Sequence, residues 1–336
     1  MPRGDIGIDL GTASIIVYKR GEGIVLHEPS VVAISEKTGE IVAIGEEAKK
    51  MLGKTPEGLK AIRPMKDGVI ADYRMIEAII RNFLKKIIGR FSFVKPSLIM
   101  GVPTKITEVE KRAVFEAGLN AGARRVHIVS EPIAAAIGAG IDVMASEGNM
   151  VVDIGGGTTD IAVISLGGTV VGESVRMAGD AMDEAIVKFI RKKYGLIIGE
   201  STAEEIKKRI GKTHPAFENY EIEIKGRDVV TGLPRTDRVS SEDVREAIEP
   251  IIFALLTKLK NVLERTPPEL SADIINNGIR LTGGGALLRG LDRTIYDEIH
   301  VKTIVADDPI TCVARGTGIL LEDEKLLKTV CETYSR

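Results

Sequence analysis

Short hydrophobic stretches, separated by glycine-containing turns, dominate the first part of the chain. Brief apolar runs between such turns are typical of β-strands that are buried in a sheet. The pattern predicts strands over residues 6–10, 15–19, 29–34, 41–44, 98–102 and 126–130.

Helical spacing is found between these strands. Apolar residues recur at helical intervals over 73–88, and Gly89 marks the expected end of that helix. Thr107 and Glu110 have the spacing of a capping box, which predicts a helix over 107–121. Two further helices are predicted over 46–52 and 132–139. Strands that alternate with helices favour an α/β fold.

The pattern starts again at Met150, where a strand, a glycine-rich turn and a second strand repeat the opening of the chain. The matching residues Asp9 and Asp153 are 144 positions apart (153 minus 9). Such self-similarity predicts a duplicated α/β unit, with insertions that form smaller subdomains. In the second half we expect strands over 151–154, 161–165, 220–225, 227–230 and 279–282, and helices over 183–194, 203–210 and 241–264.

Composition limits the class of protein. A chain of 336 residues suggests about two domains, and 44% hydrophobic with 28% charged residues is ordinary for a globular protein. The net charge of −2 gives no reason to expect nucleic acid as a partner. The two cysteines have no disulfide or zinc spacing, and no apolar run reaches the length of a membrane span. We therefore expect a cytoplasmic protein without a signal peptide.

The two repeated turns have the chemistry of phosphate binding. Each strand ends in an aspartate, which can hold Mg²⁺ through its water shell. Glycine lets backbone N–H groups approach phosphate oxygens, and Thr or Ser adds a hydroxyl donor. The turn residues are Gly11, Thr12, Ala13 and Ser14 in the first copy, and Gly155, Gly156, Gly157 and Thr158 in the second. One copy alone could be an ordinary tight hairpin, but two copies in register favour a phosphate site.

Competing nucleotide motifs fail on inspection. The segments 53–55 and 211–213 end like a P-loop, but Ala48 and Ile206 stand where the first glycine is required. No Gly-x-Gly-x-x-Gly run is complete, so the dinucleotide-binding interpretation fails as well.

The two hairpins, the segment 130–136 and a third glycine turn over 281–285 resemble the superfamily of actin, heat-shock chaperones and sugar kinases. Longer segments are similar to the MreB/Mbl family of bacterial actin-like cell-shape proteins across nearly the whole chain. These segments are 61–72, 149–153, 178–183 and 231–234. One departure is Ser14, where the family usually carries Asn; Ser keeps a hydrogen-bonding group.

This resemblance implies a duplicated actin-like (ribonuclease H-like) α/β fold, with two lobes around a nucleotide cleft. The implied subdomains are IA (1–32, 66–145 and 315–336), IB (33–65), IIA (146–181 and 246–314) and IIB (182–245). It also implies ATP or ADP with Mg²⁺ as ligands, and slow hydrolysis of ATP coupled to polymerisation. The implied partners are other copies in paired protofilaments, an anionic membrane surface at the inner face of the cytoplasmic membrane, and cell-elongation membrane proteins. The implied role is to organise cell-wall synthesis and maintain rod shape.

Site residues follow from the same resemblance. Asp9 and Asp153 would hold Mg²⁺ through water, and Glu131 would activate the attacking water with help from Thr158. The two hairpin turns would bind the phosphates. The rest of the nucleotide would lie against Gly179, Asp180, Glu204, Glu205, Ile206, Lys207, Gly283, Gly284, Gly285, Ala286 and Leu287. Taken alone, Glu131 could equally cap the helix that follows it, and residues 204–207 could be a solvated helix face.

A short apolar segment follows the helix that ends at Gly89. Phe91, Phe93 and Val94 lie among basic residues, which suits an anionic membrane surface, although both aromatics could instead fold back into the core. The family resemblance favours the membrane interpretation.

Two other functions of the same fold stay open at this point. A small-molecule kinase would transfer the γ-phosphate to a hydroxyl and would need a further base in a substrate pocket. A chaperone ATPase would need a separate peptide-binding domain.

Overall fold

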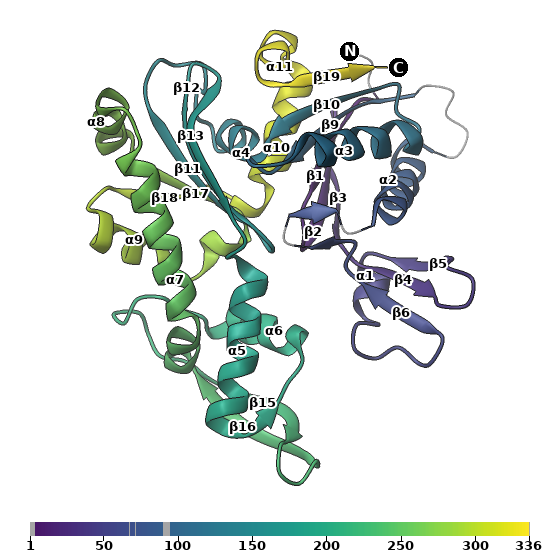
Figure 1. Cartoon of the computed structure of the whole chain (residues 1–336), viewed down its shortest axis with the longest axis vertical. Coiled ribbons are helices and arrows are strands. Elements are labelled where there is room, and N and C mark those ends of the chain that lie inside the picture. The colour runs from purple at the N-terminus through teal and green to yellow at the C-terminus, as the bar shows by residue number, and fades with distance from the viewer. Residues whose placement is uncertain (1–3, 67, 71, 90–94, 336) are drawn as a thin grey trace.

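A computed structural model describes residues 4–66, 68–70, 72–89 and 95–335. The chain forms two lobes, each built around a mixed β-sheet, and its last helices return to the lobe in which it began (Figure 1). Among the described residues, none of the helices combines the length and the apolar composition that a membrane span requires.

The first lobe contains a six-stranded sheet in the order β19-β10-β9-β1-β2-β3. Its strands are β1 (Ile6–Leu10), β2 (Ser14–Lys19), β3 (Gly23–Pro29), β9 (Ser97–Val102), β10 (Arg125–Ser130) and β19 (Glu332–Ser335). The buried faces of α2 (Tyr73–Ile88) and α3 (Glu108–Ala121) complete its core. The predicted capping box is confirmed, because Thr107 and Glu110 each accept a hydrogen bond from the other's backbone N–H.

The second lobe repeats this sheet in the order β13-β12-β11-β17-β18. Its strands are β11 (Asn149–Ile154), β12 (Thr159–Ser165), β13 (Gly168–Val175), β17 (Ile279–Thr282) and β18 (Thr303–Val305). β11 is antiparallel to β12 and parallel to β17, as β1 is to β2 and β9, so the predicted duplication is confirmed. Outside this sheet lie α7 (Ser241–Glu264), α8 (Pro268–Asn277), η1 (Gly284–Leu287), α9 (Leu291–Ile299) and η2 (Pro309–Thr311).

Two helices lie between the sheets (Figure 1). α4 (Glu131–Gly138) and α10 (Cys312–Glu322) cross so closely that a Cβ on Gly138 would overlap the carbonyl oxygen of Cys312. Likewise, a Cβ on Gly316 would overlap the carbonyl oxygen of Ala134. The alanine-rich sequence of α4 therefore provides the small surface that this crossing needs. α11 (Glu324–Val330) follows α10.

Each lobe also carries a smaller subdomain. In the first lobe it consists of β4 (Val32–Ser35), β5 (Ile41–Ile44), α1 (Glu46–Lys49) and β6 (Leu59–Ile62), followed by the hairpin of β7 (Met65–Lys66) and β8 (Val69–Ile70). In the second lobe it contains α5 (Gly179–Tyr194), β14 (Leu196–Ile197), α6 (Glu200–Ile210), β15 (Glu221–Asp228) and β16 (Pro234–Ser240).

Two predicted strand boundaries were wrong. The stretch 29–34 is not one strand, because β3 ends at Pro29 and β4 begins at Val32 in another sheet. The two strands predicted over 220–225 and 227–230 are one strand, β15 (Glu221–Asp228), with Gly226 inside it. There the glycine permits close approach, since a Cβ would lie 2.5 Å from the carbonyl oxygen of Ile197.

Candidate functional site

The site is a cleft of about 710 Å³ that is lined by residues of both lobes. Both predicted phosphate hairpins, Glu131 and the third glycine turn face this one space. The predicted site is therefore a single cleft, assembled from segments that are far apart in the sequence.

The first hairpin links β1 to β2. The Gly11 N–H donates to the carbonyl oxygen of Ser14 at 3.1 Å, which closes a tight turn and leaves Thr12 and Ala13 at its tip. The Thr12 hydroxyl accepts a hydrogen bond from the backbone N–H of Gly68 at 3.1 Å. The β7–β8 hairpin thus contacts the first phosphate loop directly.

The second hairpin links β11 to β12 with the same backbone hydrogen bond, from the Gly155 N–H to the carbonyl oxygen of Thr158 at 2.9 Å. Its tip faces the first hairpin: a Cβ on Gly156 would lie 2.6 Å from the Cβ of Ala13. Glycine at this position therefore lets the two phosphate loops approach each other. The carbonyl oxygens of Gly155 and Gly156 accept hydrogen bonds from the N–H groups of Gly179 and Asp180, which begin α5.

Four carboxyl groups gather at the inner end of the cleft. Burial, reinforced by the charge of Asp153, raises the pKa of Asp9 to about 8. Burial likewise raises the pKa of Asp153 to about 7, although Thr282 donates a hydrogen bond to it at 2.7 Å. The pKa values of Glu131 and Asp160 are also raised, mainly by burial, and for Glu131 the other three carboxylates add to the effect. Such an arrangement attracts a cation, because positive charge relieves the repulsion.

Asp160 is a site residue that the sequence analysis missed. It lies opposite Asp153 in the β11–β12 pair and is 1% exposed. Its carboxylate accepts a hydrogen bond from the backbone N–H of Thr104 in the first lobe at 2.8 Å. It therefore connects the two lobes as well as adding charge beside Glu131.

The third glycine turn lies against the second hairpin. Gly283 has φ 77°, and a Cβ there would overlap the carbonyl oxygen of Ile154. A Cβ on Gly285 would overlap the side chain of the same residue. Glycine is thus required for the turn to pack at the end of β11, and Gly284 and Leu287 then line the cleft.

α6 forms the opposite wall at this end. Glu204 and Lys207, two of the residues predicted to bind the nucleotide, line the cleft. The Lys207 ammonium is held within the protein, 2.8 Å from the Asp183 carboxylate and 2.7 Å from the Gly179 carbonyl oxygen. Burial raises the pKa of Asp183 to about 6 despite this ion pair.

Two ion pairs join the lobes across the cleft. Arg63 lies 2.7 Å from the Asp180 carboxylate, and Lys49 lies 3.4 Å from that of Glu204. In this closed arrangement the carboxylate of Asp180, predicted to lie near the nucleotide, is engaged by the other lobe. Arg63, Lys49 and Gly68 were not found from the sequence, because nothing in their local pattern signals a contact across a cleft.

Three predicted residues lie away from the cleft lining. Glu205 is exposed and pairs with Arg209 at 3.2 Å, while Ile206 and Ala286 belong to the core of the second lobe. Phe91, Phe93 and Val94 lie outside the described residues. The P-loop-like Lys212 is buried and donates to the carbonyl oxygen of Phe217 at 3.0 Å, which agrees with the rejection of that motif.

Comparison with known proteins gives a consistent result. A sequence model described as MreB/Mbl protein matches residues 3–329. The chain is 51% identical to the cell shape-determining protein Mbl of Bacillus cereus over 319 residues, which are 95% of this chain and 96% of that protein. It is 49% identical to the cell shape-determining protein MreB of Escherichia coli over 324 residues, covering 95% and 93% of the two chains.

Among solved structures, MreB5 of Spiroplasma citri bound to AMPPNP is similar with a TM-score of 0.90 and 39% identity, over 97% of this chain and 98% of that one. The predicted fold class, a duplicated actin-like α/β fold with two lobes around a cleft, is thereby confirmed.

Proposed function

The chain belongs to the MreB/Mbl family, and we propose that it is a filament-forming ATPase whose assembly is controlled by the nucleotide in the cleft. The observation that carries this proposal is the meeting of two phosphate hairpins and Glu131 in one space between the lobes. The related MreB5 was solved with AMPPNP, which supports a nucleoside triphosphate as the ligand.

The nucleotide would bind along the cleft. The backbone of residues 12–14 and 156–158 would receive the phosphates, and residues 204–207 and 284–287 would flank the ribose and adenine. Asp9 and Asp153 would hold Mg²⁺ through its water shell. This agrees with the finding that the described residues contain no group of three or more His, Cys, Asp or Glu side chains placed to hold a metal directly. Bound Mg²⁺ would supply charge neutralisation of the phosphates.

Glu131 would act on the attacking water. It begins α4, is 9% exposed and faces the space beside both hairpins. As the water oxygen bonds to the γ-phosphorus, the bond to the bridging oxygen breaks and ADP leaves with that electron pair. Glu131 takes the water proton, and Thr158 helps to hold the water. Burial raises the pKa of Glu131, and positive charge that arrives with the ligand would favour its ionised form.

Lobe closure would link hydrolysis to assembly. The pairs Arg63–Asp180 and Lys49–Glu204 hold the small subdomains together, and bound nucleotide would favour the same closed arrangement. A filament needs a head-to-tail contact that does not close into a ring.

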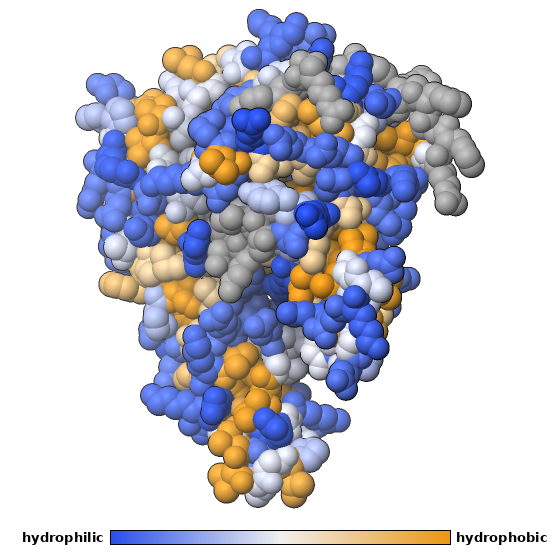
Figure 2. All heavy atoms as spheres, turned by 45° about the vertical axis from the view of Figure 1, so that its right-hand side comes forward, coloured by the Kyte–Doolittle hydropathy of each residue, from blue (hydrophilic) through white to orange (hydrophobic). Residues whose placement is uncertain are grey.

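The turn between β15 and β16 is our candidate for one side of that contact. It forms the apolar tip of the second lobe (Figure 2), where Val230 and Leu233 are 92% and 65% exposed. An exposed apolar tip at one end of an elongated molecule suits burial against a second copy.

We also propose that the filament lies on the inner face of the cytoplasmic membrane. There it would contact cell-elongation membrane proteins and organise cell-wall synthesis. The exposed residues Lys85, Lys86 and Lys95 flank the predicted apolar segment and would face anionic lipid. Sedimentation with vesicles that contain anionic lipid should show binding that the double change Phe91→Ser, Phe93→Ser removes. Retained binding would count against this segment.

The decisive experiment is light scattering and electron microscopy after addition of ATP and Mg²⁺, with phosphate release followed in parallel. We expect filaments and slow release of phosphate, and Val230→Asp should prevent filaments while leaving nucleotide binding intact. Phosphorylation of a sugar without any polymer would instead establish the small-molecule kinase alternative, which no described feature favours.

A further inference from the structure

Arg289 lies two residues after the end of η1, and it lines the cleft together with Leu288 and Gly211. Its guanidinium is held by the end of α6, on the opposite wall. Nε donates to the carbonyl oxygen of Gly211 at 3.1 Å, and Nη2 donates to that of Ile210 at 2.9 Å. The last carbonyl groups of a helix have no partner within the helix, so Arg289 caps α6 from outside.

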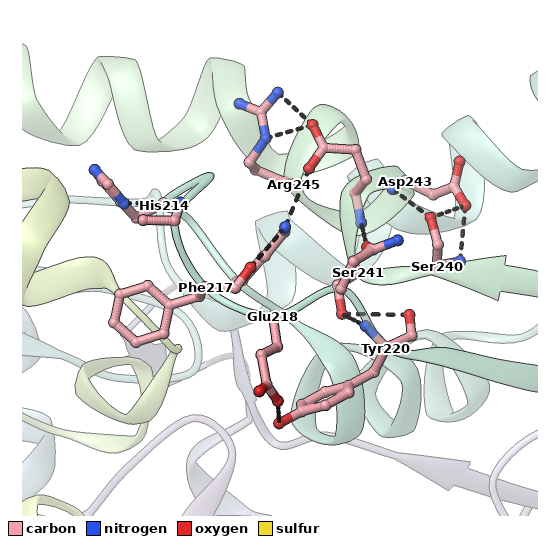
Figure 3. Close-up of polar contacts among 12 residues, drawn as sticks. His214, Phe217, Glu218, Tyr220, Ser240, Ser241, Asp243 and Arg245 are labelled. Atoms are coloured by element: carbon pink, nitrogen blue, oxygen red, sulfur yellow. Dashed lines mark hydrogen bonds and ion pairs between the residues drawn. The ribbon is translucent and has the colours of Figure 1, made fainter.

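The same guanidinium is fixed on its other sides. Nη2 also donates to the Ser241 hydroxyl at 3.0 Å, and the guanidinium carbon lies 4.3 Å from the centre of the Tyr220 ring. Tyr220 is itself held, since its N–H donates to the Ser241 hydroxyl and its phenol donates to Glu218 (Figure 3). A planar fork that is bonded at its edges and stacked on its face has little freedom to move.

The backbone adds to this connection. The Thr213 N–H donates to the carbonyl oxygen of Arg289 at 2.9 Å, and a Cβ on Gly211 would lie 2.8 Å from the Leu288 side chain. The end of α6 and the segment after η1 therefore form one rigid unit. α6 carries Glu204 and Lys207 on one wall of the cleft, and η1 carries Gly284 and Leu287 on the other.

We propose that Arg289 is a positioning residue that sets the width of the nucleoside end of the cleft. This inference rests on the proposed binding of ATP. The phosphate hairpins make no hydrogen bond to Arg289 within the described part of the chain, so Arg289 acts on recognition of base and ribose and leaves phosphate recognition unchanged. Lysine is a poor replacement, because its compact ammonium lacks the planar fork that bonds at its edges while its face stacks on a ring.

The test compares two ligands by isothermal titration calorimetry in the presence of Mg²⁺. ATP uses the whole cleft, whereas inorganic tripolyphosphate uses the phosphate hairpins alone. For Arg289→Ala we expect Kd for ATP to rise about tenfold and Kd for tripolyphosphate to stay within about twofold. Arg289→Lys keeps the charge and should also raise the ratio of Kd for ATP to Kd for tripolyphosphate. It provides a second variant if the alanine variant does not fold.

Arg293→Ala is the matched control. Arg293 also stacks on a tyrosine, Tyr296 at 5.5 Å, and pairs with Asp297, but it does not line the cleft. Its removal should leave both affinities unchanged. An equal loss of both affinities in folded Arg289 variants, or no loss of either, would overturn the positioning role. Wild-type protein that binds neither ligand would instead overturn the proposed function, and the inference with it.

Discussion

The two phosphate hairpins share a backbone and differ in their side chains. Each closes with the same hydrogen bond, Gly11 to Ser14 in the first lobe and Gly155 to Thr158 in the second. The copies diverge two residue pairs beyond this bond, where Asp9 lies opposite Ile16 but Asp153 lies opposite Asp160. The backbone geometry of the hairpin is thus duplicated, whereas the second copy carries two paired buried carboxylates where the first carries a single carboxylate.

The tips of the hairpins differ for a steric reason. Ala13 occupies the tip of the first turn, and only a glycine fits opposite it at Gly156. Two identical turns with side chains at both positions would collide when the lobes close. Divergence between the copies is therefore a condition for forming one cleft from two equivalent halves.

Of the changes considered, Glu131→Gln should have the largest effect, because it removes the proposed base from the carboxyl cluster. We expect phosphate release to slow by about 10²–10⁴-fold, because the amide cannot accept the water proton. ATP binding should persist, since both hairpins are intact. A coupled phosphate assay with calorimetric titration checks this, with Glu205→Gln as the control outside the cleft. Hydrolysis at an undiminished rate would mean that the acid cluster does not supply the base.

The steric difference can be tested by Gly156→Ala, for which we expect ATP affinity to fall about tenfold because the new methyl group meets Ala13. The double variant Gly156→Ala, Ala13→Gly moves the methyl group from one hairpin to the other and should restore most of the affinity. Calorimetry measures both. If the double variant binds no better than the single one, contact between the hairpins is not what limits closure.

The difference in charge predicts a pH dependence of stability. Asp9 and Asp153 have pKa values raised to about 8 and about 7, whereas aspartates in the unfolded chain titrate near 4. Between about pH 4 and pH 8 the folded protein therefore binds more protons than the unfolded one, and this contribution lowers stability as pH rises.

Asp160→Asn should reduce the loss of folding stability at high pH. It removes one buried charge and keeps an oxygen that can accept the hydrogen bond from the Thr104 N–H. At pH 8, without nucleotide, the gain should be about 1 kcal/mol, or a few degrees in Tm, and it should shrink at pH 5. Thermal melts at the two pH values measure it. A variant that gains nothing at pH 8 would show that Asp160 adds no repulsion in the ligand-free protein.

Ser14→Asn should have the smallest effect. Position 14 contributes its carbonyl oxygen to the turn, and any residue supplies that group. We expect ATP affinity to change by less than about threefold. Titration of both forms checks this, and a larger change would show that the side chain at position 14 contacts phosphate.

The parts of the site that could be predicted from the sequence are those that depend on local pattern. The Asp–Gly pattern at positions 9 and 153 identified both hairpins, because strand ends and tight turns are local properties. Asp160, Gly68 and Arg63 were not found, since each acts through a contact with a segment that is distant in the sequence. Lys207 lies in the cleft lining, and its ion pair with Asp183 could not be foreseen from helical spacing.

The crossing of α4 and α10 also bears on how the chain folds during synthesis. The second sheet is assembled from residues between 149 and 305 in one continuous stretch, whereas the first lobe needs α10, which follows that stretch. The lobe that is translated first is therefore completed last, after the second lobe can already have formed. Until residues 312–322 leave the ribosome, the alanine-rich face of α4 that α10 covers stays exposed.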